Sequence, residues 1–242
     1  MEQLSRKVKA GYGVGDLGGN LFFTMGGFYF LFYLTDVVGI AAGLAGTALM
    51  IGKVWDAVTD PVVGFLSDGT TSRFGRRRPW LFAGAWIVFG GMVMMFYPPL
   101  GAPFVWALVA TLILNTGYTL INVPYGALTP DLTEDFHERT VLQGWRMSFA
   151  VVGTFIGAGV VLPLVGFFGG GTMGWTAMGI VIGAIIAISP LIVVLTVREK
   201  QFVPSGPPRN ILKSYGQVLT QKPFLLALIP WSLHITGVNI IQ

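Results

Sequence analysis

Six apolar runs, each long enough to cross a bilayer as a helix, constrain this chain more than any other feature. A membrane-spanning helix needs about 20 predominantly apolar residues. The chain is 53% hydrophobic and 11% charged, whereas soluble domains carry about 25% charged residues. The runs are Tyr12–Tyr33, Leu44–Leu66, Trp80–Phe96, Phe104–Pro124, Val141–Val165 and Trp175–Val197. The sequence therefore predicts an all-α membrane protein, and a seventh run begins at Pro223.

The basic residues alternate from one connection to the next. Thirteen of the 15 Lys and Arg residues lie before the first run or in the connections after the second, fourth and sixth runs. The other connections carry none. By the positive-inside rule the N-terminus is cytoplasmic, and we expect a multi-pass protein of the plasma (bacterial inner) membrane. The net charge of +4 therefore marks one membrane face and does not indicate nucleic-acid binding.

Composition divides the chain into three segments. They are a six-helix bundle at 1–197, a polar cytoplasmic linker at 198–222 and the start of a seventh helix at 223–242. This order is typical of the first half of a two-half carrier, so we expect a truncated product that lacks its C-terminal half. A six-helix protein with a short tail is the alternative.

The second run carries a stripe of ionisable residues, Lys53, Asp56 and Asp60. Spacings of three and four place all three side chains on one face of a helix. A charged side chain at mid-bilayer costs about 2.5–3.5 kcal/mol on insertion scales. The stripe therefore predicts a polar, ion-handling interior that binds H⁺ or Na⁺, and a purely structural salt bridge is the alternative.

Other function classes are less compatible with these residues. An intramembrane enzyme would need a nucleophile with its base, or a metal motif such as HExxH, and the sequence contains neither. Cysteine is absent, which excludes thiolate chemistry. We expect no enzyme activity, no cofactor and no metal beyond a possible Na⁺ at Asp56 and Asp60. A channel remains a rival, because it would conduct without coupling.

Two further patterns concern how helices meet. In the connection Gly64–Trp80, Asp68 can pair with Arg73 or Arg76 and act as a conformational latch between helix ends. The alternative is that the arginines only bind anionic lipid head groups. Gly-x-x-x-Gly pairs such as Gly153 and Gly157 predict close helix contacts. The stretch 122–126, Asn-Val-Pro-Tyr-Gly, either breaks the fourth helix or ends it.

Together, several stretches resemble one family. GFLSDGTTSRFGRRRPW (64–80) is similar to a signature of the major facilitator superfamily, in the form found in glycoside–pentoside–hexuronide:cation symporters, the melibiose permease-like family. YGVGDLGGN (12–20), FYLTDVVGI (32–40), KVWDAVTDP (53–61) and the stretch 117–140 resemble the same family. The resemblance implies the N-terminal six-helix half of a twelve-helix fold, built from three-plus-three inverted repeats.

The resemblance also implies roles for single residues. Asp56 and Asp60 match the carboxylates that bind the coupling cation, and Thr119 matches a hydroxyl at that site. Asn122 stands where the family's melibiose permease-like members have an aspartate, so it is expected beside the cation. The residues expected to line the solute cavity are Asn20, which replaces an aspartate, Lys53, which matches an arginine, and Arg146, which matches an arginine of the fifth helix. Asp16, in the glycine-rich start of the first run, is a further cavity candidate by its position, and a capping or snorkelling role near the cytoplasmic interface is the alternative.

The resemblance implies cation-coupled symport of a sugar or glycoside by alternating access. The expected partners are that small solute, the coupling cation, the lipid bilayer and the missing half. Because Asn122 and Asn20 replace aspartates, and Gly126 replaces a sugar-stacking tryptophan, two alternatives stay open. One is a carrier of a non-sugar solute such as a lysolipid, and the other is a truncated half-protein that does not transport.

Overall fold

The computed structural model describes residues 4–99 and 101–199, together with 220–222, 224–226, 228–230 and 232–233. The chain divides after Phe202 into two units. In the first unit the described residues form helices with no strand. These are α1 (Arg6–Met25), the π-helical turns η1 (Gly26–Phe30) and η2 (Tyr33–Val37), α2 (Ala42–Gly69), α3 (Arg78–Phe96), α4 (Pro103–Gly126), α5 (Leu128–Leu132), α6 (Phe136–Gly159), α7 (Val161–Phe167) and α8 (Gly171–Thr196).

The helices begin where the sequence supplies a cap or a proline. Ser5 and Asp135 cap α1 and α6, and their side chains accept hydrogen bonds from the backbone N–H groups of the third residue that follows each of them. Such caps satisfy donors that have no partner within the helix. Pro79 and Pro103 lie in the first turns of α3 and α4, where the missing N–H costs nothing. All six predicted runs are helical, with α6 and α7 together covering the fifth.

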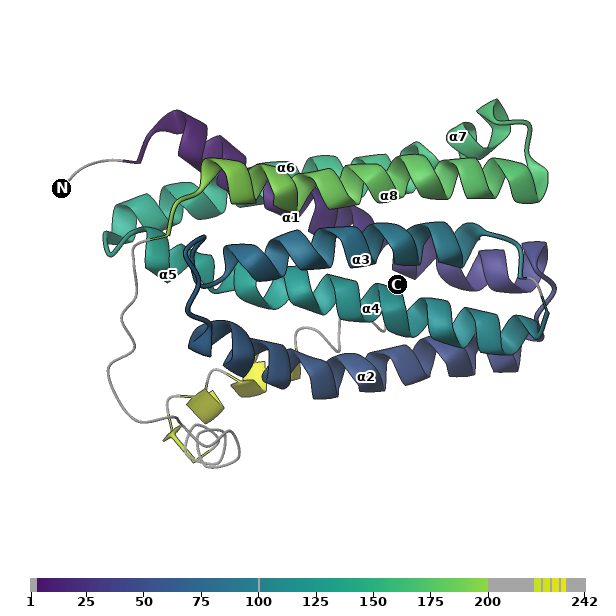
Figure 1. Cartoon of the computed structure of the whole chain (residues 1–242), viewed down its shortest axis with the longest axis horizontal. Coiled ribbons are helices and arrows are strands. Elements are labelled where there is room, and N and C mark those ends of the chain that lie inside the picture. The colour runs from purple at the N-terminus through teal and green to yellow at the C-terminus, as the bar shows by residue number, and fades with distance from the viewer. Residues whose placement is uncertain are drawn as a thin grey trace. The chain divides into compact units, whose positions relative to one another are not determined.

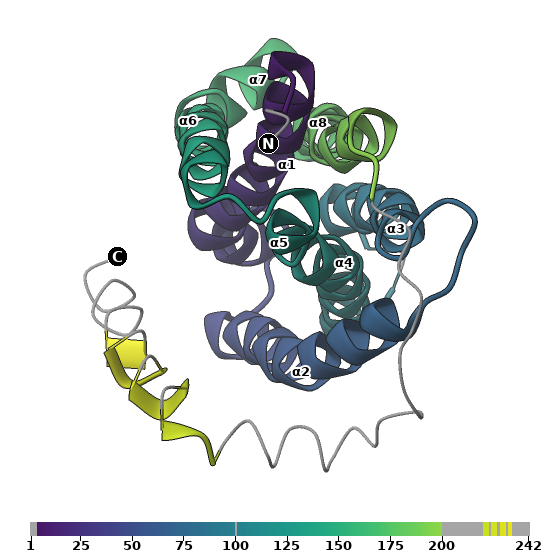
Figure 2. The same cartoon turned by 90° about the vertical axis from the view of Figure 1, so that its left-hand side faces the viewer.

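The long helices run along the length of the first unit (Figure 1). Seen from the end in Figure 2, α1 and α4 lie centrally and α6 and α2 lie on opposite flanks, while α3 and α8, called here the rear helices, lie together on the right-hand side. The main packing pairs are α1 with α6, α1 with α8, α2 with α4, α3 with α4, and α3 with α8. The central helices therefore each pack on one flanking helix and one rear helix.

This set of pairs is symmetric. The first three spans can be exchanged for the last three, with α1 replaced by α4, α2 by α6 and α3 by α8, and the reverse. This exchange turns the α1–α6 pair into the α4–α2 pair and the α3–α4 pair into the α8–α1 pair, and it leaves the α3–α8 pair unchanged. Such internal symmetry is expected of three-plus-three repeats. The fold class predicted from the sequence, the first half of a major facilitator fold, agrees with this arrangement.

Fewer helices qualify as membrane spans by composition than the six predicted. Among the described residues, α3, α4 and α8 are long and apolar enough, and α6 with α7, bent by 47°, gives a fourth when the two are counted as one span. The helices α1 and α2 do not meet this measure. The helix α2 contains four charged residues, Lys53, Asp56, Asp60 and Asp68, and charged side chains lower the hydropathy of a span.

The α1–α6 contact depends on small residues. A Cβ atom placed on Gly153 of α6 would collide with the backbone carbonyl oxygen of Leu17 in α1, and one on Gly157 would lie 2.8 Å from the Cβ of Thr24. The predicted role of this glycine pair, close helix approach, is confirmed. It fixes how near the flanking helix comes to the central one.

Two local features differ from, or refine, the sequence-based expectations. The first run is not a single α-helix, because η1 and η2 give its second half π-helical turns. The helix α4 continues through Asn122 and Pro124 and ends at Gly126. The stretch 122–126 therefore ends the fourth helix and does not break it, since a proline in the last turn removes only one backbone hydrogen bond.

The predicted segment boundaries lie mostly beyond what the structure describes. Of the linker at 198–222, only 198, 199 and 220–222 are described, and of the segment 223–242 only the residues given above. Those described from 222 to 233 are helical. The division into bundle, linker and seventh helix stays a prediction.

Candidate transport site

The acidic stripe of α2 faces α4. The hydroxyl of Thr119 donates a hydrogen bond to Oδ1 of Asp60 at 2.8 Å, and Thr119 is buried. Nearby, Nε1 of Trp55 donates to Oγ1 of Thr116 at 2.9 Å. The α2–α4 packing thus brings together Asp60 and Thr119, two of the four residues predicted for the cation site.

The other carboxylate of the stripe has spare acceptor capacity. The side chain of Asp56 is 21% exposed, and Nζ of Lys53 lies 3.7 Å from its Oδ2. Its Oδ1 is buried and has no hydrogen-bond partner within the described residues. The Lys53 side chain is 72% exposed, so its contact with Asp56 is a weak surface-type pair. An unpartnered buried carboxylate oxygen suits a bound cation or a proton.

Asn122 is the predicted cation-site residue that the structure does not bring into contact with the others. It lies one turn beyond Thr119 on α4 and is exposed, and its side chain makes no hydrogen bond within the described part of the chain. In that same part, no group of three or more His, Cys, Asp or Glu residues is arranged to hold a metal. Two carboxylates and a hydroxyl fit a monovalent cation or a proton carried as cargo.

A second polar cluster joins α1, α4 and α6. The guanidinium of Arg146 donates to both carboxylate oxygens of Asp16, through Nε to Oδ2 and through Nη2 to Oδ1 at 3.2 Å. The hydroxyl oxygen of Tyr125 also lies 3.3 Å from Oδ2 of Asp16. Arg146 lies over the ring of Tyr125, 4.9 Å from its centroid. Both charged side chains are largely buried, at 16% and 14% exposure.

Tyr12 and Tyr125 complete this cluster by bonding to each other's helices. The Tyr125 hydroxyl donates to the backbone oxygen of Tyr12 at 2.7 Å, and the Tyr12 hydroxyl donates to the backbone oxygen of Tyr125 at 3.2 Å. Asn20 bonds within its own helix, donating to the backbone oxygen of Asp16 at 2.9 Å. The predicted cavity residues Asp16, Asn20 and Arg146 are therefore neighbours.

The pairing of Asp16 with Arg146 was not predicted, although both residues were singled out. A signal was available. Asp16 is the only acidic residue in the run Tyr12–Tyr33, and Arg146 is the only basic residue in the run Val141–Val165. Charges inside spans usually pair with one another.

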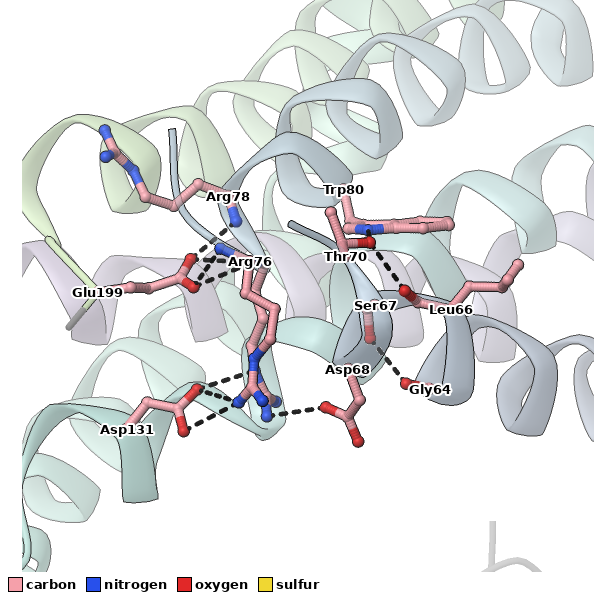
Figure 3. Close-up of polar contacts among 11 residues, drawn as sticks. Gly64, Leu66, Ser67, Asp68, Thr70, Arg76, Arg78, Trp80, Asp131 and Glu199 are labelled. Atoms are coloured by element: carbon pink, nitrogen blue, oxygen red, sulfur yellow. Dashed lines mark hydrogen bonds and ion pairs between the residues drawn. The ribbon is translucent and has the colours of Figure 1, made fainter. Parts of the chain in front are cut away.

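The end of the bundle that carries Arg73, Arg76, Arg77 and Arg78, called here the basic end, holds a third polar cluster, shown in Figure 3. The predicted latch residue Asp68 forms an ion pair at 3.0 Å with Arg77, an arginine that the prediction did not choose. Arg77 also contacts Asp131 at 2.9 Å, as does the predicted Arg76. The predicted Arg73 lies over the Phe74 ring. Burial lowers the pKa of the Arg77 guanidinium, and the carboxylates of Asp131 and Asp68 oppose that shift.

Glu199 was missed entirely. It follows α8, and its carboxylate accepts hydrogen bonds from the backbone N–H groups of Arg76, Arg77 and Arg78 at 2.7–3.0 Å (Figure 3). Gly75 has a φ of +111°, and a Cβ atom added to it would lie only 3.0 Å from Oε1 of Glu199. A carboxylate at the N-terminus of a helix is favoured by the helix dipole. No spacing in the sequence links position 199 to 76–78.

Comparisons with known proteins agree with this geometry. The family model described as MFS/sugar transport protein matches residues 11–241. The chain is 36% identical to YagG of Escherichia coli, named as a glycoside/cation symporter, over 90% of this chain and 49% of that protein. It is 33% identical to the isoprimeverose transporter of Lactiplantibacillus pentosus, over 84% of this chain and 45% of that protein.

A third relative carries a different cargo in its name. The chain is 36% identical to the sodium-dependent lysophosphatidylcholine symporter 1 of Gallus gallus, over 68% of this chain and 32% of that protein. The chain thus spans about half the length, or less, of these curated relatives.

Proposed function

Because this chain belongs to the MFS/sugar transport protein family, a family of multi-pass membrane transporters and not of enzymes, we propose that the complete protein moves a sugar or glycoside together with H⁺ or Na⁺ by alternating access. The observation that carries the proposal is the Thr119–Asp60 hydrogen bond beside the unpartnered Oδ1 of Asp56. The names of YagG and of the isoprimeverose transporter support the cargo.

Electrostatics explains how this site couples ion and solute. Asp56 and Asp60 are one turn apart, about 6 Å along the helix axis, and at that distance two carboxylates repel by roughly 3 kcal/mol at an effective dielectric constant near 20. A cation between them, or a proton on one of them, removes the repulsion. Closing the bundle over a neutralised stripe costs less than closing it over two charges, so ion binding favours the closed, solute-loaded state.

The other predicted residues take their roles from this arrangement. Asn20, Asp16, Arg146 and Lys53 line the solute cavity, and the exposed Lys53 side chain also lies beside Asp56. The basic end faces the cytoplasm, and Asp68 with its arginines holds helix ends together there. The protein lies in the plasma (bacterial inner) membrane.

Uptake into proteoliposomes that contain the complete transporter tests the proposal. A panel of sugars and glycosides is offered while H⁺ and Na⁺ gradients are imposed separately, and the gradient that drives accumulation identifies the ion. Asp60→Asn should abolish accumulation and leave downhill exchange, because it removes the charge that the ion neutralises. Asp36→Asn, at an exposed position in η2, serves as the matched control. Accumulation at the wild-type level in Asp60→Asn would refute the coupling role.

A lysolipid is the second candidate cargo, favoured by the similarity to the lysophosphatidylcholine symporter. Lysophosphatidylcholine therefore joins the solute panel. Accumulation of this lipid, and of no sugar, would replace the sugar assignment while keeping the coupling mechanism. Downhill flux that neither gradient accelerates would indicate a channel or an uncoupled carrier.

A further inference from the structure

The two basic side chains inside the spans are held in different ways. The Arg146 guanidinium makes two contacts with one carboxylate, Asp16, and its face lies on the Tyr125 ring. A second ring, that of Tyr12, lies 5.7 Å away. Two-pronged Arg–carboxylate pairs are among the strongest charged hydrogen bonds. The guanidinium edge that would otherwise bind an anionic solute is thus already occupied.

Lys53 provides the contrast. Its ammonium lies 3.7 Å from Asp56 and is 72% exposed, whereas Arg146 is 16% exposed. Lys53 therefore lies beside the predicted ion site and has a single loose contact. Arg146 is the base fixed beside the predicted solute cavity, and its charge is cancelled by a residue of another helix.

We propose that Asp16 is a specificity-determining positioning residue, which neutralises Arg146 so that the cavity accepts an uncharged sugar or glycoside and rejects the corresponding uronate. This inference rests on the proposed function and names the charge class of its solute. The contacts that carry it are those from Nε and Nη2 of Arg146 to Asp16 and from the Tyr125 hydroxyl to the same carboxylate.

The rejection of a uronate follows from desolvation. A solute carboxylate could reach the guanidinium edge only by displacing Asp16, which would leave one of two anions without its partner in a mostly buried place. Removing one partner from a buried ion pair is strongly unfavourable. A neutral sugar hydroxyl does not compete with Asp16 for the guanidinium edge. It can donate or accept a hydrogen bond at the edge of the Asp16–Arg146 pair and leave the pair intact.

The test uses the complete transporter in proteoliposomes and a matched pair of solutes. The solute panel described above first identifies a transported sugar, and the second solute is the same sugar with a carboxylate at its terminal carbon. The wild-type protein should take up the neutral solute at least about tenfold faster, the factor that one charge-assisted hydrogen bond is worth. Asp16→Asn should shift this ratio toward the uronate by about tenfold.

Two further variants separate selectivity from folding. Asp16→Glu keeps the charge and should keep the wild-type preference. The double variant Asp16→Asn with Arg146→Gln leaves no unpaired charge. It should therefore lose the increase in uronate uptake, relative to the neutral sugar, that Asp16→Asn shows. If Asp16→Asn is not recovered as a monodisperse protein, the wild-type ratio still tests the proposal, because equal uptake of the two solutes by the wild-type protein would overturn it.

Each outcome bears on one of the two proposals. Wild-type uptake of the uronate at the rate of the neutral sugar would overturn the role of Asp16, and so would an Asp16→Asn variant whose ratio matches the wild-type value. Absence of any gradient-driven uptake by the wild-type protein would instead overturn the proposed function. The two failures are therefore distinguishable.

Discussion

Replacing Glu199 by Gln should destabilise the basic end more than any other single-atom change there. The carboxylate accepts from three successive backbone N–H groups, those of Arg76, Arg77 and Arg78, and each of its two oxygens is used twice. Gln offers one acceptor oxygen and turns an NH₂ group toward the remaining donors. A partly buried donor that loses its acceptor costs about 1–3 kcal/mol, so the free energy of unfolding should fall by roughly 2–4 kcal/mol when two donors are affected.

Thermal unfolding of the purified complete transporter, followed by tryptophan fluorescence, measures this loss. At a few degrees per kcal/mol, the midpoint should fall by about 5–10 °C. The matched control is Glu134→Gln, the same substitution at an exposed position, which should change the midpoint little. Equal midpoints for the two variants would show that the Glu199 carboxylate does not hold α8 to the start of α3.

Two other substitutions test packing and charge. Gly153→Ala should lower the free energy of unfolding by about 1–3 kcal/mol, because the new Cβ meets the Leu17 carbonyl oxygen. The control is Gly144→Ala, in the same helix but with open space around it. A similar thermal midpoint for both variants would contradict the close approach of α1 and α6. Arg77→Gln should destabilise by about 1–3 kcal/mol, because it leaves Asp68 and Asp131 facing each other with less compensation. The control Arg73→Gln, at an exposed position, should be nearly silent, and thermal unfolding of both arginine variants checks this difference.

The sequence was sufficient for the helical framework. Hydropathy marks spans because each must satisfy its backbone hydrogen bonds internally, and the first six predicted runs are helical in the structure. The family resemblance is confirmed by the family model and by the named symporters. The stripe on α2 was also predictable, since helical spacing alone places Asp56 and Asp60 on one face.

Contacts between helices were harder to predict, because spacing along one helix does not determine its partner. Arg77 is buried and meets Asp68, while Arg73, four residues before it, is exposed. Four consecutive or nearly consecutive arginines look equivalent in sequence, whereas in the structure Arg76 and Arg77 contact Asp131 of α5 and Arg78 donates to the backbone oxygen of Val194 in α8. Glu199 likewise gains its role from the approach of α8 to α3.

The internal symmetry of the bundle relates the two polar clusters to each other. Exchanging the two three-helix repeats turns the α4–α2 pair, which holds the Thr119–Asp60 contact, into the α1–α6 pair, which holds the Asp16–Arg146 contact. Each cluster therefore joins a central helix to its flanking helix at an equivalent interface. One contains two carboxylates and a loosely held lysine, while the other contains a carboxylate and an arginine that cancel. In the function proposed above, the first interface takes up positive charge and the second stays neutral, which separates ion binding from solute binding. This is why Asp60→Asn should affect coupling, while Asp16→Asn should affect the choice of solute.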